Sequence, residues 1–211
     1  CDDGSDFDYR DLPHPVAGHQ RSVLNILRDF HAGPFGSRQR TLSATSFVIV
    51  SPSARARLDE TCLIGRGWWN DDWWVPAIES GLMEIASHSW DHNHDTLPAG
   101  DFAGVERGTF ESIASEPLAD YQIASATSYL MQRVKNPGAS LFAYPYGKSN
   151  EFLVKDYLPR RGAAIGLKAA FTDNPEPLHR GSNRWELPRY VSKRDWTSPA
   201  ELTKILEQAI R

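Results

Sequence analysis

The chain has 211 residues, of which 40% are hydrophobic and 24% are charged, a composition that allows one globular α/β domain over residues 1–211. The net charge of −4 offers no basic surface to neutralise phosphates, so nucleic acid is excluded as an expected partner. No apolar run reaches about 18 residues, and we therefore expect no membrane span. Cys1 and Cys62 provide no disulfide framework and form either one bridge or two separate thiols.

The first half of the chain alternates between helical and strand-like hydrophobic spacing. The predicted elements are a polar loop over 5–20, a helix over 23–30, a strand over 46–50, a helix over 70–81 and a strand over 82–86. The first helix carries apolar side chains at positions i, i+3, i+4 and i+7, and Gly33-Pro34 ends it.

The second half begins with a long excursion over 93–116 and then returns to alternation. The predicted elements are helices over 123–134 and 152–158, strands over 141–144, 163–171 and 187–191, and a last helix that opens at Ser198. We expect the last helix to turn Leu202, Ile205, Leu206 and Ala209 inward. Alternation of this kind predicts a mainly parallel sheet covered by helices, either doubly wound or closed into a barrel.

Two segments offer the ligands of a hydrolytic metal site. Asp2-Asp3-Gly4 supplies two adjacent carboxylates, and His88 and His92 supply two imidazoles directly after the strand over 82–86. Three nitrogen or carboxylate ligands with a fourth position open to water are typical of catalytic zinc. Two alternatives without a metal remain open. Asp2-Asp3-Gly4 is then a simple turn, and the histidines lie in a polar loop and form hydrogen bonds only to the backbone.

These two motifs, together with Phe142-Ala143-Tyr144-Pro145-Tyr146-Gly147, resemble the polysaccharide deacetylases, the NodB-homology or carbohydrate esterase family 4 domain. The resemblance extends from Asp2 to Leu187-Pro188-Arg189. It implies an irregular (β/α) barrel of about seven strands whose first strand ends at Cys1. We therefore expect the chain to be a fragment or a processed form, with any targeting signal upstream.

The resemblance assigns a role to each motif. It implies that Asp2 is the general base, that Asp3, His88 and His92 bind the metal, and that the backbone amide of Tyr146 stabilises the oxyanion. His94 is an alternative ligand, and Asp91 is either an orienting partner of a ligand imidazole or a solvated carboxylate.

The chain departs from the family pattern at two places. Ala143 stands where many members carry an arginine that holds the catalytic aspartate, and Arg189 is the expected substitute unless it is exposed. The late Leu-x-His motif of the general acid is missing, which leaves His179 as the candidate proton donor. Asp195-Trp196 is a weak match to the Asp-Trp motif that borders the acetyl pocket.

Aromatic and acidic residues are further candidates to contact a sugar. Four tryptophans fall within seven residues, at 68, 69, 73 and 74, and serve either as a substrate platform or as core. The first loop adds Asp6, Asp8, Asp11 and His14, either as a border of the groove or as solvated side chains.

Taken together, these features predict a metal-dependent hydrolase that removes N-acetyl groups from an amino-sugar polymer or oligosaccharide. The expected ion is Zn²⁺, with Co²⁺ or Ni²⁺ as alternatives, and no organic cofactor is implied. Two rivals remain: an O-acetyl esterase or other amide hydrolase on the same fold, and a catalytically impaired carbohydrate-binding protein. A location in the bacterial envelope or outside the cell is favoured over the cytoplasm, and the sequence does not predict the oligomeric state.

Overall fold

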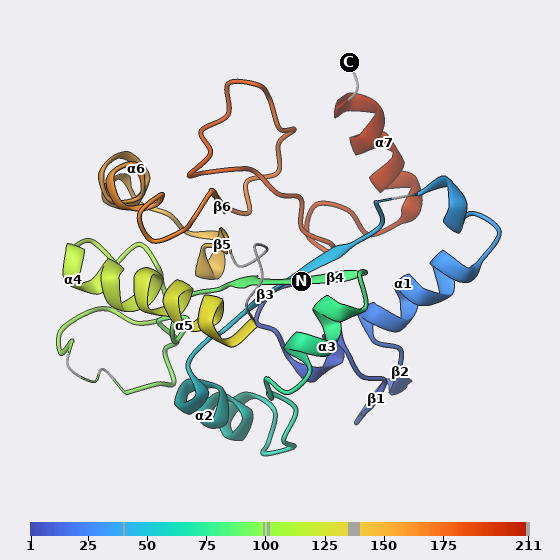
Figure 1. The fold of residues 1–211 in the computed structure, drawn as a ribbon, viewed down its shortest axis with the longest axis horizontal. Coiled ribbons are helices and arrows are strands. Elements are labelled where there is room, and N and C mark those ends of the chain that lie inside the picture. Colours follow the sequence, from blue (N-terminus) through green and yellow to red (C-terminus); the bar gives the residue numbers. More distant parts are fainter. Residues whose placement is uncertain (40, 99, 101, 135–139, 210–211) are drawn as a thin grey trace.

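The structure is a computed structural model of the chain, and it describes all residues except 40, 99, 101, 135–139 and 210–211. Its centre is a parallel sheet in the order β3-β4-β5-β6 (Figure 1). The bounds of these strands are Ala44–Val48, Met83–Ser87, Leu141–Ala143 and Ala169–Phe171. All pairings between neighbours are parallel, so the carboxyl ends of the four strands meet at one edge.

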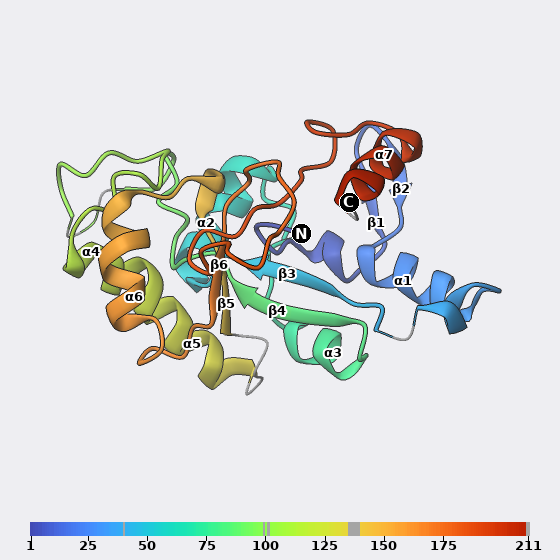
Figure 2. The ribbon, with the colours of Figure 1, turned by 90° about the horizontal axis from the view of Figure 1, so that it is seen from above.

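Helices surround the sheet, as the alternating pattern predicted (Figures 1 and 2). Their bounds are α1 Val23–Ala32, α2 Pro52–Cys62, α3 Trp74–Glu79, α4 Glu116–Ala119, α5 Ser125–Val134, α6 Leu158–Arg161 and α7 Pro199–Ala209. Two wide turns of π-helix, Asp120–Ala124 and Phe152–Tyr157, lead into α5 and α6. None of the described helices is long and apolar enough to cross a membrane.

The core has two main parts, one on each half of the sheet. Beside β3 and β4, the buried side chains come mainly from α1, α3 and α5, and include Leu24, Trp74 and Leu130. Beside β5 and β6, the core is aromatic, with Phe142 and Tyr157 fully buried. Both views place α4, α5 and α6 together on the side of β5 and β6, with α1 on the opposite side of the molecule (Figures 1 and 2).

The predicted α/β class is confirmed, whereas the barrel of about seven strands is not. Among the described residues, the main sheet has four strands and does not close into a barrel. Residues 1–3 lie along the outer side of β3, where the Phe47 amide donates to Cys1 O at 2.9 Å and the Ile49 amide to Asp3 O at 3.2 Å. At the other edge, Leu187 makes a single parallel bridge to Phe171.

Two predicted strands are wrong in extent. Only Ala169–Phe171 of the strand over 163–171 forms, because the chain turns at Gly166, whose φ of +87° favours glycine. The strand over 187–191 is reduced to the Leu187 bridge, since the next residues turn toward the site.

Three further differences concern loops and helices. The loop over 5–20 contains a short turn at Asp6–Asp8 and a hairpin of β1 (Leu12–His14) and β2 (Gly18–Gln20). Helix α2, capped by the Ser51 hydroxyl, follows β3 without having been predicted. The inward face predicted for the last helix is wrong, because α7 has no buried residue and Leu206 is 55% exposed.

Candidate metal centre

The predicted site residues come from the carboxyl ends of neighbouring strands. Asp2 and Asp3 end the segment beside β3, and His88 directly follows β4. His92 lies four residues later in a loop, with a φ of 63°, and Tyr146 lies in the turn after β5. In parallel sheets this edge is where active sites are built, because strands bring residues from distant parts of the sequence to one place.

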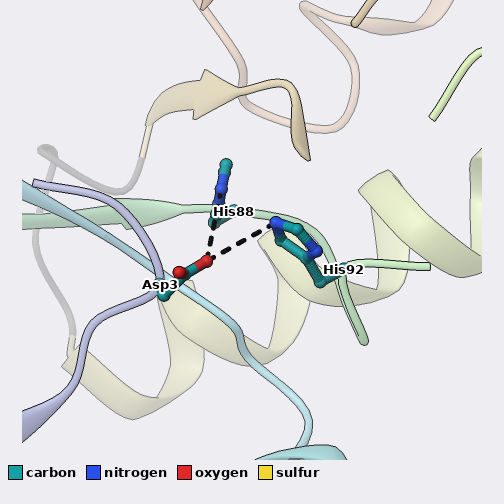
Figure 3. Close-up of side chains that lie close together, drawn as sticks. All are labelled: Asp3, His88 and His92. Atoms are coloured by element: carbon teal, nitrogen blue, oxygen red, sulfur yellow. Dashed lines mark ion pairs between the residues drawn. The ribbon is translucent and has the colours of Figure 1, made fainter. Parts of the chain in front are cut away.

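Asp3, His88 and His92 form a compact group of ligands (Figure 3). The Asp3 carboxylate oxygen Oδ1 lies 3.7 Å from His88 Nε2 and 3.5 Å from His92 Nε2. One ligand atom from each residue lies within 4.8 Å of the others. This spacing suits three ligands around one ion, since zinc binds carboxylate oxygen and imidazole nitrogen at about 2.0–2.2 Å.

Hydrogen bonding orients the first imidazole toward the group. The His88 side chain is 2% exposed, and its Nδ1 lies 2.8 Å from the backbone oxygen of Ala143. Nδ1 is therefore the protonated nitrogen, because a carbonyl can only accept, and the lone pair of Nε2 is left to face Asp3. The Nδ1 of His92 is buried and has no hydrogen-bond partner among the described residues.

The ionisation of the group fits a cation between the ligands. Burial, with smaller contributions from His88 and His94, lowers the pKa of His92 to about 2, so its imidazole is neutral. Burial also raises the pKa of Asp3, and the neighbouring Asp2 carboxylate adds to this shift although His88 opposes it. A half-exposed carboxylate beside two buried imidazoles is stabilised by a divalent ion, and these residues therefore fit one.

Asp2 points to a different partner from Asp3. Two nitrogens of the Arg189 guanidinium donate to the Asp2 carboxylate at 2.8 and 3.1 Å, and a third donates to Thr172 O at 2.9 Å. Burial would raise the pKa of Asp2, but the charges of His88 and Arg189 outweigh it and lower the pKa to about 2. Asp2 is therefore ionised at neutral pH. Arg189 thus contacts Asp2 in the way expected of the arginine that many polysaccharide deacetylases carry at the position of Ala143.

The turn after β5 is held in an unusual conformation. Tyr144 is buried, and its hydroxyl donates to Trp185 O at 2.9 Å, which anchors the start of the turn. Tyr146 has φ 59° and ψ 11°, and its ring packs edge-on against His92 with centroids 4.4 Å apart. A Cβ added to Gly147 would lie 2.1 Å from Asp173 Cγ, so only glycine fits there.

Six of the seven predicted site residues line one pocket of about 520 Å³. They are Asp2, Asp3, His88, His92, Tyr146 and Arg189. His179, the seventh, is exposed and does not line this pocket; its amide donates to the Ser182 hydroxyl at 3.0 Å within its own loop. The structure shows no contact between His179 and the described site residues, and its role stays a prediction.

Cys62 and Asp173, which the sequence did not indicate as site residues, also line the pocket, as does His94, the alternative ligand. His94 Nδ1 faces Asp95 at 3.0 Å, and its Nε2 lies 4.0 Å from Cys62 Sγ. Cys1 and Cys62 are both free thiols. Asp173 had a signal in the sequence, because it lies two residues after the end of the predicted strand over 163–171.

The tryptophan cluster divides between core and pocket. Trp73 and Trp74 are fully buried, so they serve packing. Trp69 lines the pocket, and its indole nitrogen donates to Asp3 O at 3.0 Å. Trp68 packs edge-on against Phe7 with ring centroids 5.2 Å apart.

The remaining acidic candidates are committed to structural contacts. Asp91 is buried and accepts from Gln122 and Arg107 rather than from a ligand imidazole. Asp6 and Asp8 are also buried, where Asp6 accepts from Arg10 and Asn70 and Asp8 accepts from Ser46. Asp11 pairs with Arg21, His14 is exposed, and Asp195 pairs with Arg194.

Comparison with known proteins finds matches through structure alone. No family model matches the sequence, and no curated protein matches it. A protein from Bacillus anthracis assigned to the polysaccharide deacetylases aligns with 90% of this chain at a TM-score of 0.55 and 14% identity. A Streptococcus pyogenes deacetylase, solved with acetate, aligns with 97% at a TM-score of 0.56 and 18% identity. The deacetylase domain of BpsB from Bordetella bronchiseptica aligns with 90% at a TM-score of 0.51 and 16% identity.

The alignment covers a smaller share of each of these three proteins than of the present chain. The chain spans 44% of the Bacillus anthracis protein, 67% of the Streptococcus pyogenes deacetylase and 68% of the Bordetella bronchiseptica domain. At these sequence identities the comparison establishes the fold. The resemblance indicated by the three motifs is thus confirmed for the fold, and the chain has the fold of polysaccharide deacetylases.

Proposed function

We propose that this protein is a metal-dependent hydrolase that removes N-acetyl groups from an amino-sugar polymer or oligosaccharide. The observation that carries the proposal is the grouping of Asp3, His88 and His92 beside an ionised Asp2 in one pocket. The solved structures with this fold include a deacetylase crystallised with acetate, the acid released in such a reaction.

The ligand set would hold one divalent ion through Asp3, His88 and His92. Two imidazoles and one carboxylate favour Zn²⁺, and Co²⁺ or Ni²⁺ suit the same donors. When bound, such an ion lowers the pKa of water and polarises a carbonyl group.

The residues of the chain then divide the proton transfers. Asp2 removes a proton from the attacking water, and Arg189 keeps Asp2 ionised and oriented for this. The backbone amide of Tyr146 donates a hydrogen bond to the oxyanion, because the left-handed turn at this residue redirects its peptide groups. His179 is the proposed proton donor to the leaving amine, and its exposed loop would have to fold over the pocket for that role.

A second function is favoured by one observation. His179 lies outside the pocket, and an ester releases an alcohol that needs less protonation than an amine. An O-acetyl esterase on the same site is therefore the alternative. A pure carbohydrate-binding role is less well supported, because Arg189 supplies the contact to Asp2 that Ala143 cannot make.

The proposal is tested with two variants that separate metal binding from proton transfer. We expect Asp2→Asn to retain zinc and to release acetate from N-acetylglucosamine oligomers about 10²–10⁴-fold more slowly. We expect His88→Ala to lose both zinc and turnover. His31→Ala, a substitution of an exposed histidine on α1, is the matched control and should leave both unchanged. Full activity of Asp2→Asn would overturn the assignment of the base.

Activity against acetate esters in place of N-acetylglucosamine oligomers would favour the esterase alternative. Tight oligomer binding without release of acetate from either substrate would favour the binding protein.

A further inference from the structure

Asp173 is an acidic residue of the pocket to which the proposed mechanism gives no role. It lies two residues after the end of β6 and lines the pocket together with Asp3 and His92. Its side chain is 24% exposed, so the carboxylate is within reach of a bound ligand.

The two oxygens of the Asp173 carboxylate have different surroundings. The guanidinium of Arg194 pairs with Oδ2, and it also donates to the backbone oxygen of Asp173. Oδ1 lies against Gly147, 2.2 Å from the place that a Cβ would occupy. No described residue donates a hydrogen bond to Oδ1, so one strong acceptor remains free beside the turn that carries the proposed oxyanion donor.

The main chain holds this acceptor firmly in place. Arg189 donates from Nε to Thr172 O at 2.9 Å and from its backbone amide to Asn174 O at 3.1 Å. These bonds fix the residues on either side of Asp173, and they use the same arginine that pairs with Asp2. Asp173 is therefore positioned relative to the proposed base.

The ion-paired group of Asp173, Asp195 and Arg194 carries a net negative charge. Arg194 is shared between Asp173 and Asp195, so two carboxylates face one guanidinium. A ligand that approaches Oδ1 therefore meets a net negative group, which attracts hydroxyl donors and repels acidic substituents.

We propose that Asp173 is a specificity-determining residue, which accepts a hydrogen bond from a hydroxyl group of the sugar that carries the acetamido group. It selects uncharged N-acetylated sugar units over units with a carboxylate substituent close to that group. This inference rests on the proposed function, since it deepens the description of the same site.

Asp195 provides a matched control for Asp173. Both residues pair with Arg194, but Asp195 is 11% exposed and does not line the pocket. Asp173→Asn and Asp195→Asn therefore remove the same kind of ion pair, and only the first removes a charge that faces the ligand. If Asp173→Asn does not fold, Asp173→Ser supplies the same loss with a smaller side chain.

Two measurements test the proposal. The first is calorimetric binding of N-acetylglucosamine oligomers to the zinc-loaded protein on an Asp2→Asn background, where turnover is about 10²–10⁴-fold slower. We expect Asp173→Asn to weaken binding about tenfold, because a charged acceptor is replaced by the neutral oxygen of an amide, and Asp195→Asn to change it less than twofold.

The second measurement is selectivity in the otherwise native enzyme. It compares kcat/KM for oligomers of N-acetylglucosamine with kcat/KM for oligomers that contain N-acetylmuramic acid, which adds a carboxylate to the same ring. We expect Asp173→Asn to reduce the preference for the uncharged substrate about tenfold, and Asp195→Asn to leave it unchanged.

The outcomes separate this inference from the proposed function. Acetate release by the native enzyme with identical affinity and selectivity in Asp173→Asn would overturn the role of Asp173 alone. Oligomer binding without acetate release by the native enzyme would overturn the proposed function, and the binding comparison would still decide the role of Asp173. Absence of oligomer binding by the native protein would overturn both.

Discussion

Replacement of Arg189 by methionine gives the sharpest test of how the proposed base is kept ionised. Arg189 makes two hydrogen bonds to Asp2 at 2.8 and 3.1 Å, and its side chain is 21% exposed. Methionine fills much of the same volume without charge or donors. The substitution therefore removes the ion pair and leaves Asp2 with the effect of burial, which raises a carboxyl pKa.

The expected shift follows from these opposing effects. The pKa of Asp2 is about 2 with Arg189 present, against an ordinary value of 3.8. Without the guanidinium we expect it to rise toward the ordinary value, since the hydrogen bonds and the charge of Arg189 no longer oppose burial. The effect on stability is small, because the Asp2 side chain is 41% exposed and such pairs contribute about 1 kcal/mol or less.

The sign of the pH dependence follows from the lowered pKa. The unfolded chain binds a proton at Asp2 near pH 3.8, and the folded chain does so only near pH 2. The stabilisation from the pair is therefore complete above pH 3.8 and is lost as the pH falls through 2. Arg189→Met should show its deficit in stability at neutral pH, and the deficit should vanish in strong acid.

The assay is an NMR titration of carbon-labelled aspartate carboxyls in the metal-free protein, with the Asp2 resonance assigned by Asp2→Asn. Arg194→Met serves as a control, because Arg194 pairs with Asp173 and Asp195 and makes no contact with Asp2. An Asp2 pKa that stays near 2 in Arg189→Met would refute the reasoning, as would an equal shift in the control.

Two further predictions concern the framework of the site. Gly147→Ala should lower the free energy of unfolding by about 3 kcal/mol, because a Cβ at φ +66° is strained and lies 2.1 Å from Asp173 Cγ. Thermal unfolding measures this loss, and an unchanged melting temperature would contradict the prediction. Trp73→Ala should lower the free energy of unfolding by about 3–5 kcal/mol, because it leaves a cavity in the core. If the variant instead loses only affinity for the sugar, Trp73 is part of a substrate-binding surface and not of the core.

The sequence predicted the elements that position the site better than it predicted the periphery. The strand before His88 was expected over 82–86 and forms over Met83–Ser87, because a short apolar run between Gly81 and a polar loop has few alternatives. The two histidine ligands could also be predicted, because His88 and His92 lie only four residues apart in the same loop. The amphipathic helix over 23–30 also forms, as α1, since its apolar spacing and Ser22 cap are local features.

The failures have physical causes that local sequence does not contain. The strand expected over 163–171 was an apolar run, yet Gly162 and Gly166 turn the chain and leave three residues in the sheet. Helix α7 has the spacing of a buried helix, but none of its side chains is fully buried, and Leu202 and Ile205 are only partly covered. The irregular barrel of about seven strands came from the family resemblance, whereas the described residues form a parallel sheet of four strands.

Long-range contacts within the site were also beyond local patterns. Arg189 pairs with Asp2 across 187 positions of the sequence, and only the absence of an arginine at Ala143 indicated it. The sequence indicates His179 as the proton donor because it is the only histidine in the last part of the chain. Its position along the chain does not predict that it lies in an exposed loop.

The most direct test of the central claim is acetate release from N-acetylglucosamine oligomers by the metal-stripped protein, before and after zinc is added back. We predict no release from the stripped protein and full recovery with one equivalent of zinc, as expected if Asp3, His88 and His92 hold a catalytic ion. Zinc bound at one equivalent without acetate release, or release that does not depend on metal, would contradict the account.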